Sequence, residues 1–112
     1  MDIKTLSFSN DTLTVQPLVA ALVARNAAHF AGALQPLWRS GLRLEVNLSR
    51  VDRFDGAGVG ALLSCQRAMQ RQGCTLVLTQ VQPHLERELQ ACGLHALLAT
   101  PSDSPFPNHW VH

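Results

Sequence analysis

The sequence predicts an α/β fold, in which one mixed sheet of four to five strands packs against helices. Two short alternating runs open the chain. Strand-like and helix-like segments then follow each other, and a turn of small residues joins the clearest strand to an apolar helix. Strands that alternate with helices pair in parallel and are joined by right-handed crossovers. We therefore expect the element order β-β-α-β-α-β-α, with a mainly parallel inner sheet.

The start of the chain predicts a hairpin followed by a helix. Residues 2–8 and 13–15 alternate around the turn residues Ser9-Asn10-Asp11, as the strands of a hairpin do. Pro17 suits the first turn of a helix, which is expected over residues 17–35. Apolar residues recur through that range at helical spacing, and they are Val19, Val23, Ala27, Phe30 and Leu34.

The middle of the chain predicts a strand, a crossing and a second helix. Residues 42–48 carry an apolar side chain at every second position, the period of a strand. Val51 and Phe54 are expected to anchor the polar crossing to the core. Asp55 suits the N-cap position, because its carboxylate can accept hydrogen bonds from the free amides of a first helical turn. The helix is then expected over residues 57–72.

The last third predicts a buried strand and a short helix. Residues 75–81 form an apolar run that suits a strand covered on both faces. Gly73 is a natural end for the helix over residues 57–72. Pro83 can open the last helix, and Gly93 is a natural end for it. A short apolar clasp follows, made of Leu94, Leu97 and Leu98.

Length and composition suggest one folded domain, residues 1–99, followed by a Pro/Ser-rich tail, residues 100–112. Hydrophobic residues make up 46% of the chain and charged residues 15%, so we expect a packed core. The net charge of +1 and the scattered basic residues argue against binding nucleic acid through charge. No apolar run is long enough to cross a bilayer, and no secretory signal is visible. We expect a cytoplasmic protein without membrane insertion.

The chain carries no pattern typical of catalysis or of metal binding. Its five histidines lack ligand spacing, and its three cysteines form no CxxC pair. We interpret Cys65, Cys74 and Cys92 as reduced thiols that are buried or half-buried. Neither Ser49 nor Ser64 lies on the strained turn that a serine hydrolase requires. The sequence therefore predicts no enzyme, no metal and no cofactor.

Residues 49–60 and the exposed side of the helix after them are the candidate binding face. Small residues there place backbone amides at a helix start beside a carboxylate. The candidate contacts for a partner are Ser49, Arg50, Arg53, Asp55, Gly56, Ala57, Gly58 and Val59. We interpret Gly56 and Gly58 as providing unusual backbone angles and close packing, or as letting a partner's backbone approach.

Residues 42–98 resemble the STAS domain, the module of bacterial anti-sigma factor antagonists and of the tails of sulfate transporters. The family pattern is an apolar strand ending in Asp-Leu-Ser, then a few residues and Asp-Ser-Ser-Gly or Asp-Ser-Thr-Gly, a helix, a glycine, an apolar strand, and a helix ending near Gly-Leu. The matching segments are Val46-Asn47-Leu48-Ser49, Asp55-Gly56-Ala57-Gly58, Gly73, Leu76-Val77-Leu78 and Gly93-Leu94. The resemblance implies a STAS-like fold and a module that binds another protein.

The turn departs from the family at the position that matters for regulation. In the antagonists, the second residue after the turn Asp is a Ser or Thr that a cognate kinase phosphorylates. The added phosphate then disrupts docking through repulsion and desolvation. This chain has Ala57 there, preceded by Gly56, and Asn47 replaces the Asp that usually ends the strand. The resemblance therefore implies a module that this switch cannot regulate.

Two subgroups share more of the turn. The small cytoplasmic subunit of the bacterial ABC system that moves phospholipid between membranes is similar at Leu48-Ser49-Arg50-Val51 and at residues 55–59. STAS proteins associated with exopolysaccharide synthesis carry a similar Asp-Gly-Ser-Gly turn. Three functions stay open. They are transcription regulation through an anti-sigma factor or kinase-like partner, docking on an ABC transporter ATPase or an exopolysaccharide role, and binding of a nucleotide or lipid. A homodimer also stays open.

Overall fold

The computed structural model describes residues 2–98, apart from the side chain of His95. Four strands form one mixed sheet in the order β1-β2-β4-β6, and these are β1 (Ile3–Ser9), β2 (Thr12–Pro17), β4 (Arg43–Asn47) and β6 (Thr75–Thr79). β1 and β2 are antiparallel, whereas β2, β4 and β6 run parallel. The predicted mixed sheet with a parallel inner part is therefore confirmed.

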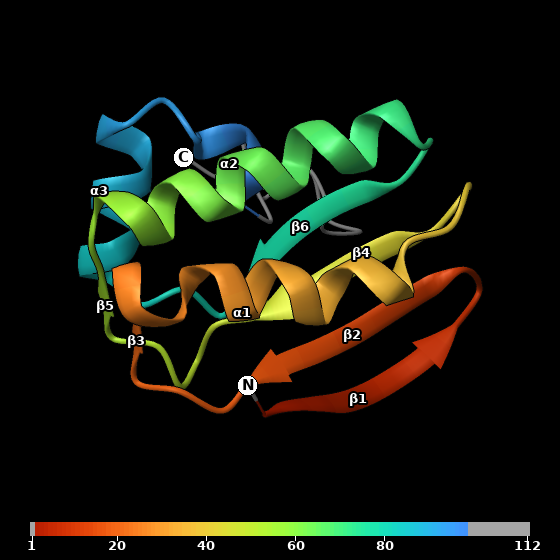
Figure 1. The fold of residues 1–112 in the computed structure, drawn as a ribbon, viewed down its shortest axis with the longest axis horizontal. Coiled ribbons are helices and arrows are strands. Elements are labelled where there is room, and N and C mark those ends of the chain that lie inside the picture. Colours follow the sequence, from red (N-terminus) through yellow and green to blue (C-terminus); the bar gives the residue numbers. More distant parts are fainter. Residues whose placement is uncertain (1, 99–112) are drawn as a thin grey trace, which may run out of the picture.

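The helices and a second, smaller sheet complete the fold. Helices α1 (Ala24–Leu34) and α2 (Gly56–Arg71) lie side by side across one face of the sheet, and α3 (Pro83–Ala91) lies at one end of the molecule (Figure 1). Two-residue strands β3 (Ala21–Leu22) and β5 (Arg53–Phe54) pair in parallel near that same end. Two short 3-10 helices follow α1 and α3, η1 (Gln35–Leu37) and η2 (His95–Leu97).

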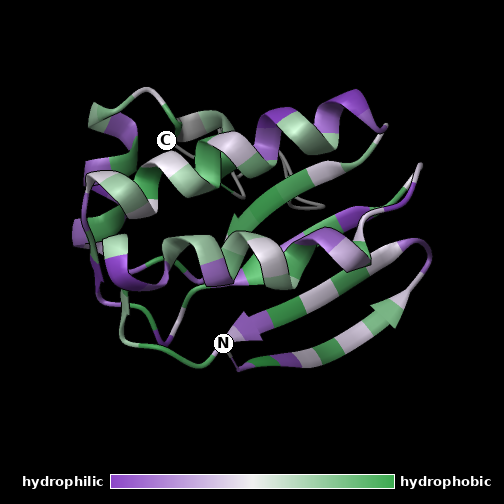
Figure 2. Cartoon of the chain, in the orientation of Figure 1, coloured by the Kyte–Doolittle hydropathy of each residue, from purple (hydrophilic) through white to green (hydrophobic). Residues whose placement is uncertain are grey.

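Alternation in the strands decides which face of the sheet is buried. In β4, Leu44 and Val46 are fully buried, while Arg43 and Glu45 face the other side and form an ion pair of 3.0 Å. Figure 2 shows this alternation as bands along β1 and β2, while β6 is hydrophobic over most of its length. In β6 three successive residues are buried, so the prediction of a strand covered on both faces is confirmed.

Most predicted element boundaries hold to within a few residues. The hairpin turn places Asn10 and Asp11 at positive φ, 51° and 65°, the mirror-image geometry that suits a two-residue hairpin. α2 spans the predicted helix, and Gly73, with φ of 76°, follows its end. The expected core anchors Val51 and Phe54 are buried, as is the clasp formed by Leu94, Leu97 and Leu98.

The helix predicted over residues 17–35 is wrong in its first third. Pro17 ends β2 instead of opening a helix, residues 21–22 form β3, and α1 begins only at Ala24. Pairing with other strands holds this segment extended, because Pro17 lies opposite Ile3 of β1 and residues 21–22 pair with β5. The predicted tail, residues 100–112, lies outside the described residues, so the division into domain and tail stays a prediction.

Candidate functional site

The chain arrives at the candidate site along a crossing that is tied down from two sides. The Asp52 N–H donates to the Ala20 carbonyl at 2.8 Å, and the Asp55 N–H donates to the Leu22 carbonyl at 3.2 Å. These bonds join residues 52–55 to the β3 segment. From the other side, the Gln82 Nε2 donates to the Val51 carbonyl at 3.0 Å. The crossing is therefore a fixed part of the fold.

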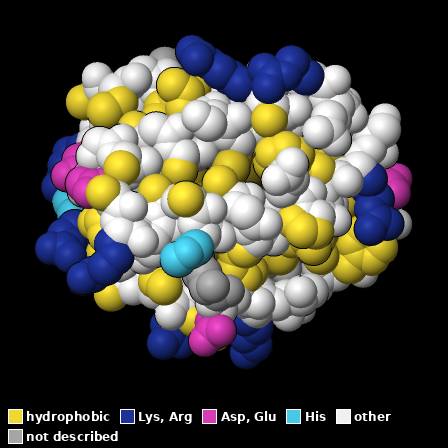
Figure 3. All heavy atoms as spheres, in the orientation of Figure 1, with side chains coloured by type: hydrophobic (Ala, Val, Ile, Leu, Met, Phe, Trp, Pro, Cys, Tyr) yellow, Lys and Arg dark blue, Asp and Glu magenta, His cyan; other side chains and the backbone are white. Residues whose placement is uncertain are grey.

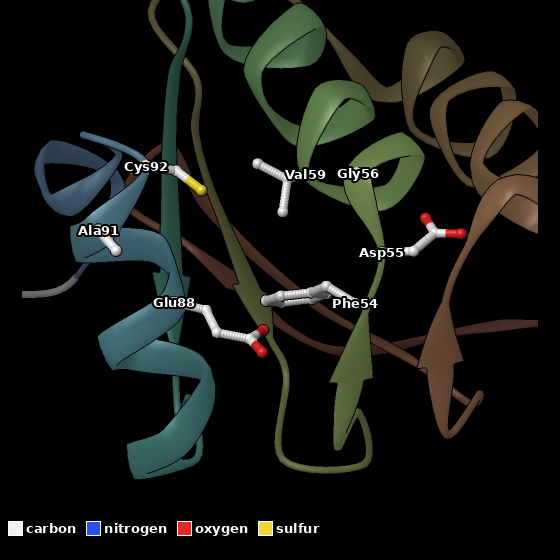
Figure 4. Close-up of a pocket in the computed structure, with 7 residues that line it drawn as sticks. All are labelled: Phe54, Asp55, Gly56, Val59, Glu88, Ala91 and Cys92. Atoms are coloured by element: carbon white, nitrogen blue, oxygen red, sulfur yellow. The ribbon is translucent and has the colours of Figure 1, made fainter.

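Asp55 joins the beginnings of two helices. Its Oδ1 accepts from the Gly58 N–H in the first turn of α2, at 2.9 Å, which confirms the predicted N-cap. Its Oδ2 accepts from the Ala24 N–H, the first residue of α1, also at 2.9 Å. Figure 4 shows the carboxylate turned toward the α1 side. One exposed side chain thus satisfies amides of both helices that cover the sheet.

The same two bonds set the charge of this carboxylate. The hydrogen bond from the Ala24 amide, followed by the bond from the Gly58 amide, lowers the pKa of Asp55 below its ordinary value. Amide donors and the positive ends of two helices favour the ionised form. Asp55 is therefore a negative charge at neutral pH whose two oxygens are already engaged.

The two glycines of the turn, Gly56 and Gly58, differ in how closely they are packed. A Cβ on Gly58 would lie 2.0 Å from the Leu22 carbonyl oxygen, so only glycine lets α2 approach β3 this closely. Nothing lies within 4 Å of a Cβ built on Gly56. The predicted close packing therefore holds for Gly58 alone. The prediction of unusual backbone angles is wrong for both, since the described glycines with positive φ are Gly41, Gly73 and Gly93.

The remaining candidate residues lie along the same segment, but they do not form one cluster. Ser49, Arg50, Arg53 and the turn residues Gly56 and Ala57 are exposed, Val59 is half-buried and Gly58 is buried. Ser49 belongs to a different local network, because its Oγ accepts from Gln16 Nε2 at 2.8 Å and its N–H donates to Asn47 Oδ1 at 2.9 Å. Asn47 thus shapes the end of β4 with its amide oxygen.

Helix α3 contributes to the site, which the sequence did not predict. An open hollow of about 380 Å³ lies between α2 and α3, lined by Phe54, Asp55, Gly56, Val59, Glu88, Ala91 and Cys92. Figure 4 shows Glu88 and Cys92 extending from α3 toward Phe54 and Val59. The pairing places residues about thirty positions apart on one surface, and no local pattern in the sequence signals it.

The front of the molecule carries a second apolar feature. Figure 3 shows hydrophobic side chains exposed along the seam between α1 and α2. Small side chains line this seam, among them Ala28, Ala31 and Ala68, with Trp38 at one end. It contains none of the residues of the Asp55 turn, but Ser64, Ala68 and Arg71 belong to the helix whose exposed side was included in the predicted binding face.

Within residues 2–98, no group of three or more His, Cys, Asp or Glu side chains could hold a metal ion. The Ser49 hydroxyl faces the amide of Gln16, which cannot act as a base. His84 is engaged through Nε2 with the Asp52 carbonyl at 2.6 Å. In the same part of the chain, no helix is both long and apolar enough to span a bilayer.

The cysteines differ in access, and this yields a first prediction. Cys65 and Cys74 are buried, as predicted, and burial raises the pKa of the Cys65 thiol. Cys92 is exposed in the hollow, so the prediction of a buried or half-buried thiol is wrong there. Cys92 is the C-cap residue of α3, and the neighbouring Leu89 and Leu94 are the side chains that enter the core. Under native conditions, Ellman's reagent is expected to titrate Cys92 alone, and the other two thiols only after unfolding.

The matched control for that titration is Cys92→Ser, which should remove the native reaction and leave the two thiols released by denaturant. Rapid reaction of two or more thiols in the folded wild-type protein would contradict the burial of Cys65 and Cys74.

Comparison with solved structures finds the same fold in several proteins. A sulfate transporter family protein from Wolinella succinogenes matches with a TM-score of 0.70 at 20% identity, covering 82% of this chain and 75% of that chain. TM1081 of Thermotoga maritima, assigned as an anti-sigma factor antagonist, matches with a TM-score of 0.69 at 18% identity, covering 88% and 87%. At these identities the likeness establishes the fold.

A third match is the anti-sigma factor antagonist SpoIIAA of Bacillus in its unphosphorylated form, with a TM-score of 0.62, 19% identity and 92% of each chain covered. A comparison with curated protein sequences finds no match. The family model described as the Mlab STAS domain matches residues 6–99. The family model spans most of the chain, and the mixed sheet and helices of this chain agree with the fold of these structures. This chain therefore belongs to the STAS domain family.

Proposed function

We propose that this STAS domain is a non-enzymatic module that docks on another protein through the N-terminal end of α2. The docking face comprises the exposed part of residues 49–59, with Gly58 beneath it as the packing point. The observation that carries the proposal is the double cap by Asp55. Because one carboxylate holds the starts of α1 and α2 together, the exposed Gly56-Ala57 turn is presented on a rigid base. Preorganised surfaces bind with less loss of entropy.

Docking at this face is constitutive or regulated elsewhere in our proposal. STAS antagonists resemble this chain at the turn but carry a phosphorylatable Ser or Thr where Ala57 stands. SpoIIAA has been solved in both phosphorylated and unphosphorylated forms. A methyl group at Ala57 offers no acceptor for a phosphate. The exposed Ser64 lies about two turns further along α2 and lines the seam with α1, so it does not substitute.

Two classes of partner fit this face. The first is an anti-sigma factor or kinase-like protein in partner-switching regulation, supported by the structural likeness to SpoIIAA and TM1081. The second is the ATPase of an ABC-type phospholipid transport system. The match to the Mlab STAS domain model and the similarity at residues 48–51 and 55–59 favour this second class. Both classes would use the same face, so one experiment addresses both.

The docking face is tested by site-specific crosslinking. A photo-reactive p-benzoylphenylalanine replaces Ala57 in one variant and Gln70 in another, since both residues are exposed on α2 at opposite ends. Irradiation in the native host, followed by mass spectrometry of the crosslinked bands, is expected to yield one dominant protein partner from position 57. Position 70 should yield little of that partner, because it lies about 20 Å away along the helix axis.

The crosslinked protein decides between the two classes. An ATP-binding transport subunit supports the transport role, and a sigma-factor regulator or related kinase supports partner switching. Equal capture of the same protein from both positions would contradict a docking face at the α2 start, as would no protein capture from position 57. Phosphate on Ser49 or Ser64 that releases the captured partner would contradict constitutive docking.

A further inference from the structure

The hollow beside the Asp55 turn combines an apolar lining with one unengaged charge. Phe54, Val59 and Ala91 provide the apolar lining, and Cys92 adds a thiol. Asp55 also borders the hollow, but both of its oxygens are bonded to the helix amides and its carboxylate turns toward the α1 side (Figure 4). The charge that faces the hollow is therefore Glu88, which Figure 4 shows extending from α3 toward the ring of Phe54.

Glu88 has no partner of opposite charge in the described part of the chain. Within residues 2–98 the ion pair is that of Arg43 with Glu45, on the sheet face away from the helices. Glu88 is exposed at the edge of the hollow. An exposed carboxylate beside an aromatic ring and aliphatic groups has the chemistry that receives an arginine, since guanidinium groups pair with carboxylates and also stack on rings.

We propose that this hollow receives an arginine side chain of the partner protein. Its guanidinium would pair with the Glu88 carboxylate and lie against Phe54, while its methylene groups would cover Val59 and Ala91. Arginine is also among the residues that most often anchor protein interfaces. The hollow shares Asp55, Gly56 and Val59 with the proposed docking face, so a partner seated there would present side chains to it.

The proposal rests on the proposed function and names the partner's contact chemistry, but it can be tested without knowing the partner. The probe is N-ethylguanidinium chloride, added to the full chain labelled with nitrogen-15 and followed by NMR. We expect amide shifts that saturate at millimolar concentrations at Val59, Glu88 and Cys92, and nuclear Overhauser effects between the probe's methylene protons and the Phe54 ring. n-Propylammonium chloride at equal ionic strength is the control, because it carries the same charge but lacks the planar guanidinium group. It should bind more weakly.

Two variants of α3 distinguish the effect of a negative charge at the hollow from the effect of losing any negative charge on the helix. Glu88→Gln should weaken binding of the guanidinium probe about threefold or more, because it removes the ion pair. Glu86→Gln is the matched control, since Glu86 is exposed on α3 but lines a different hollow beside Leu78 and Val81. It should leave the affinity unchanged.

The outcomes are distinct from those of the crosslinking experiment. Shifts that are absent, that are equal in Glu88→Gln and Glu86→Gln, or that n-propylammonium reproduces at equal strength would overturn the arginine site. The docking face would still stand if position 57 captured its partner. If the hollow binds the guanidinium probe selectively but position 57 captures no partner, the hollow is a site for a free guanidinium compound. That result would overturn the role of the hollow in docking.

Discussion

Replacing Gly58 with alanine is expected to lower the free energy of unfolding by about 3 kcal/mol, the upper end of the usual cost of overpacking. The added Cβ would lie 2.0 Å from the Leu22 carbonyl oxygen and 2.8 Å from its carbonyl carbon. These are backbone atoms, so no side-chain rotation relieves the clash. The start of α2 has to move away from β3.

The expected cost extends beyond the clash itself, because the Leu22 carbonyl also accepts the Asp55 N–H. Moving α2 stretches that bond and the bond from the Gly58 N–H to the Asp55 carboxylate. Gly58→Ala is therefore expected to weaken the crosslink from position 57 as well as the fold. Urea unfolding followed by circular dichroism measures the first effect directly.

Gly60→Ala is the matched control, two residues further along the same helix. Nothing lies within 4 Å of a Cβ built there, and the residue is exposed. Alanine should therefore raise the free energy of unfolding by about 0.5–1 kcal/mol, as glycine-to-alanine changes in helix interiors do. If both variants lose stability to the same extent, Gly58 is not the packing point between α2 and β3.

The parts of this fold that follow from sequence are those whose causes are local. The alternation in residues 42–48 specifies β4, and an N-cap carboxylate and a glycine stop delimit α2 within a residue or two. The start of α1 has a weaker local signal, because its N-cap residue is Val23 and the local capping bond is the one from the Val23 N–H to the Asn26 Oδ1, at 3.0 Å. Its first amide bonds to Asp55, 31 residues away. The helical spacing of the apolar residues extended the prediction back to Pro17, because Val19 and Val23 are half-buried in the extended segment before α1 as well.

The candidate site divides in the same way. Asp55 was predicted as the cap of α2 because Asp before a run of small residues is a local signal. Its second bond, to α1, and the hollow formed with α3 depend on which segments the sheet brings together. The sequence predicted unusual backbone angles and close packing for Gly58. The structure confirms the close packing, whereas the backbone angles of Gly58 are those of an ordinary helical residue. A sequence can indicate that a glycine is needed without indicating why.

Asp55 is expected to give the fold a stability that disappears in acid. Its folded pKa lies below the ordinary value of 3.8, because the Ala24 and Gly58 amides bond to the ionised form. In the window between the folded and the unfolded pKa, the unfolded chain binds the proton more readily, so stability rises with pH. The contribution is thus complete above about pH 4 and is lost as pH falls through the folded pKa.

Asp55→Asn tests this, because an amide offers one acceptor oxygen where the carboxylate offers two. At about pH 7 the variant should melt at a lower temperature than the wild type, since the amide cannot accept from both Ala24 and Gly58. As pH falls through the lowered pKa of folded Asp55, the wild-type side chain becomes neutral as well, and the two melting temperatures should converge. Thermal melts across that range measure the gap directly.

Asp52→Asn is the control in the same crossing. Asp52 is exposed, and its side chain makes no hydrogen bond with another residue of the described chain. At about pH 7 this variant should lose less melting temperature than Asp55→Asn. A gap between wild type and Asp55→Asn that stays constant into acid would mean that the carboxylate's charge does not hold the two helix starts together. The rigid base proposed for docking would then need another origin, since no other described side chain bonds to both helices.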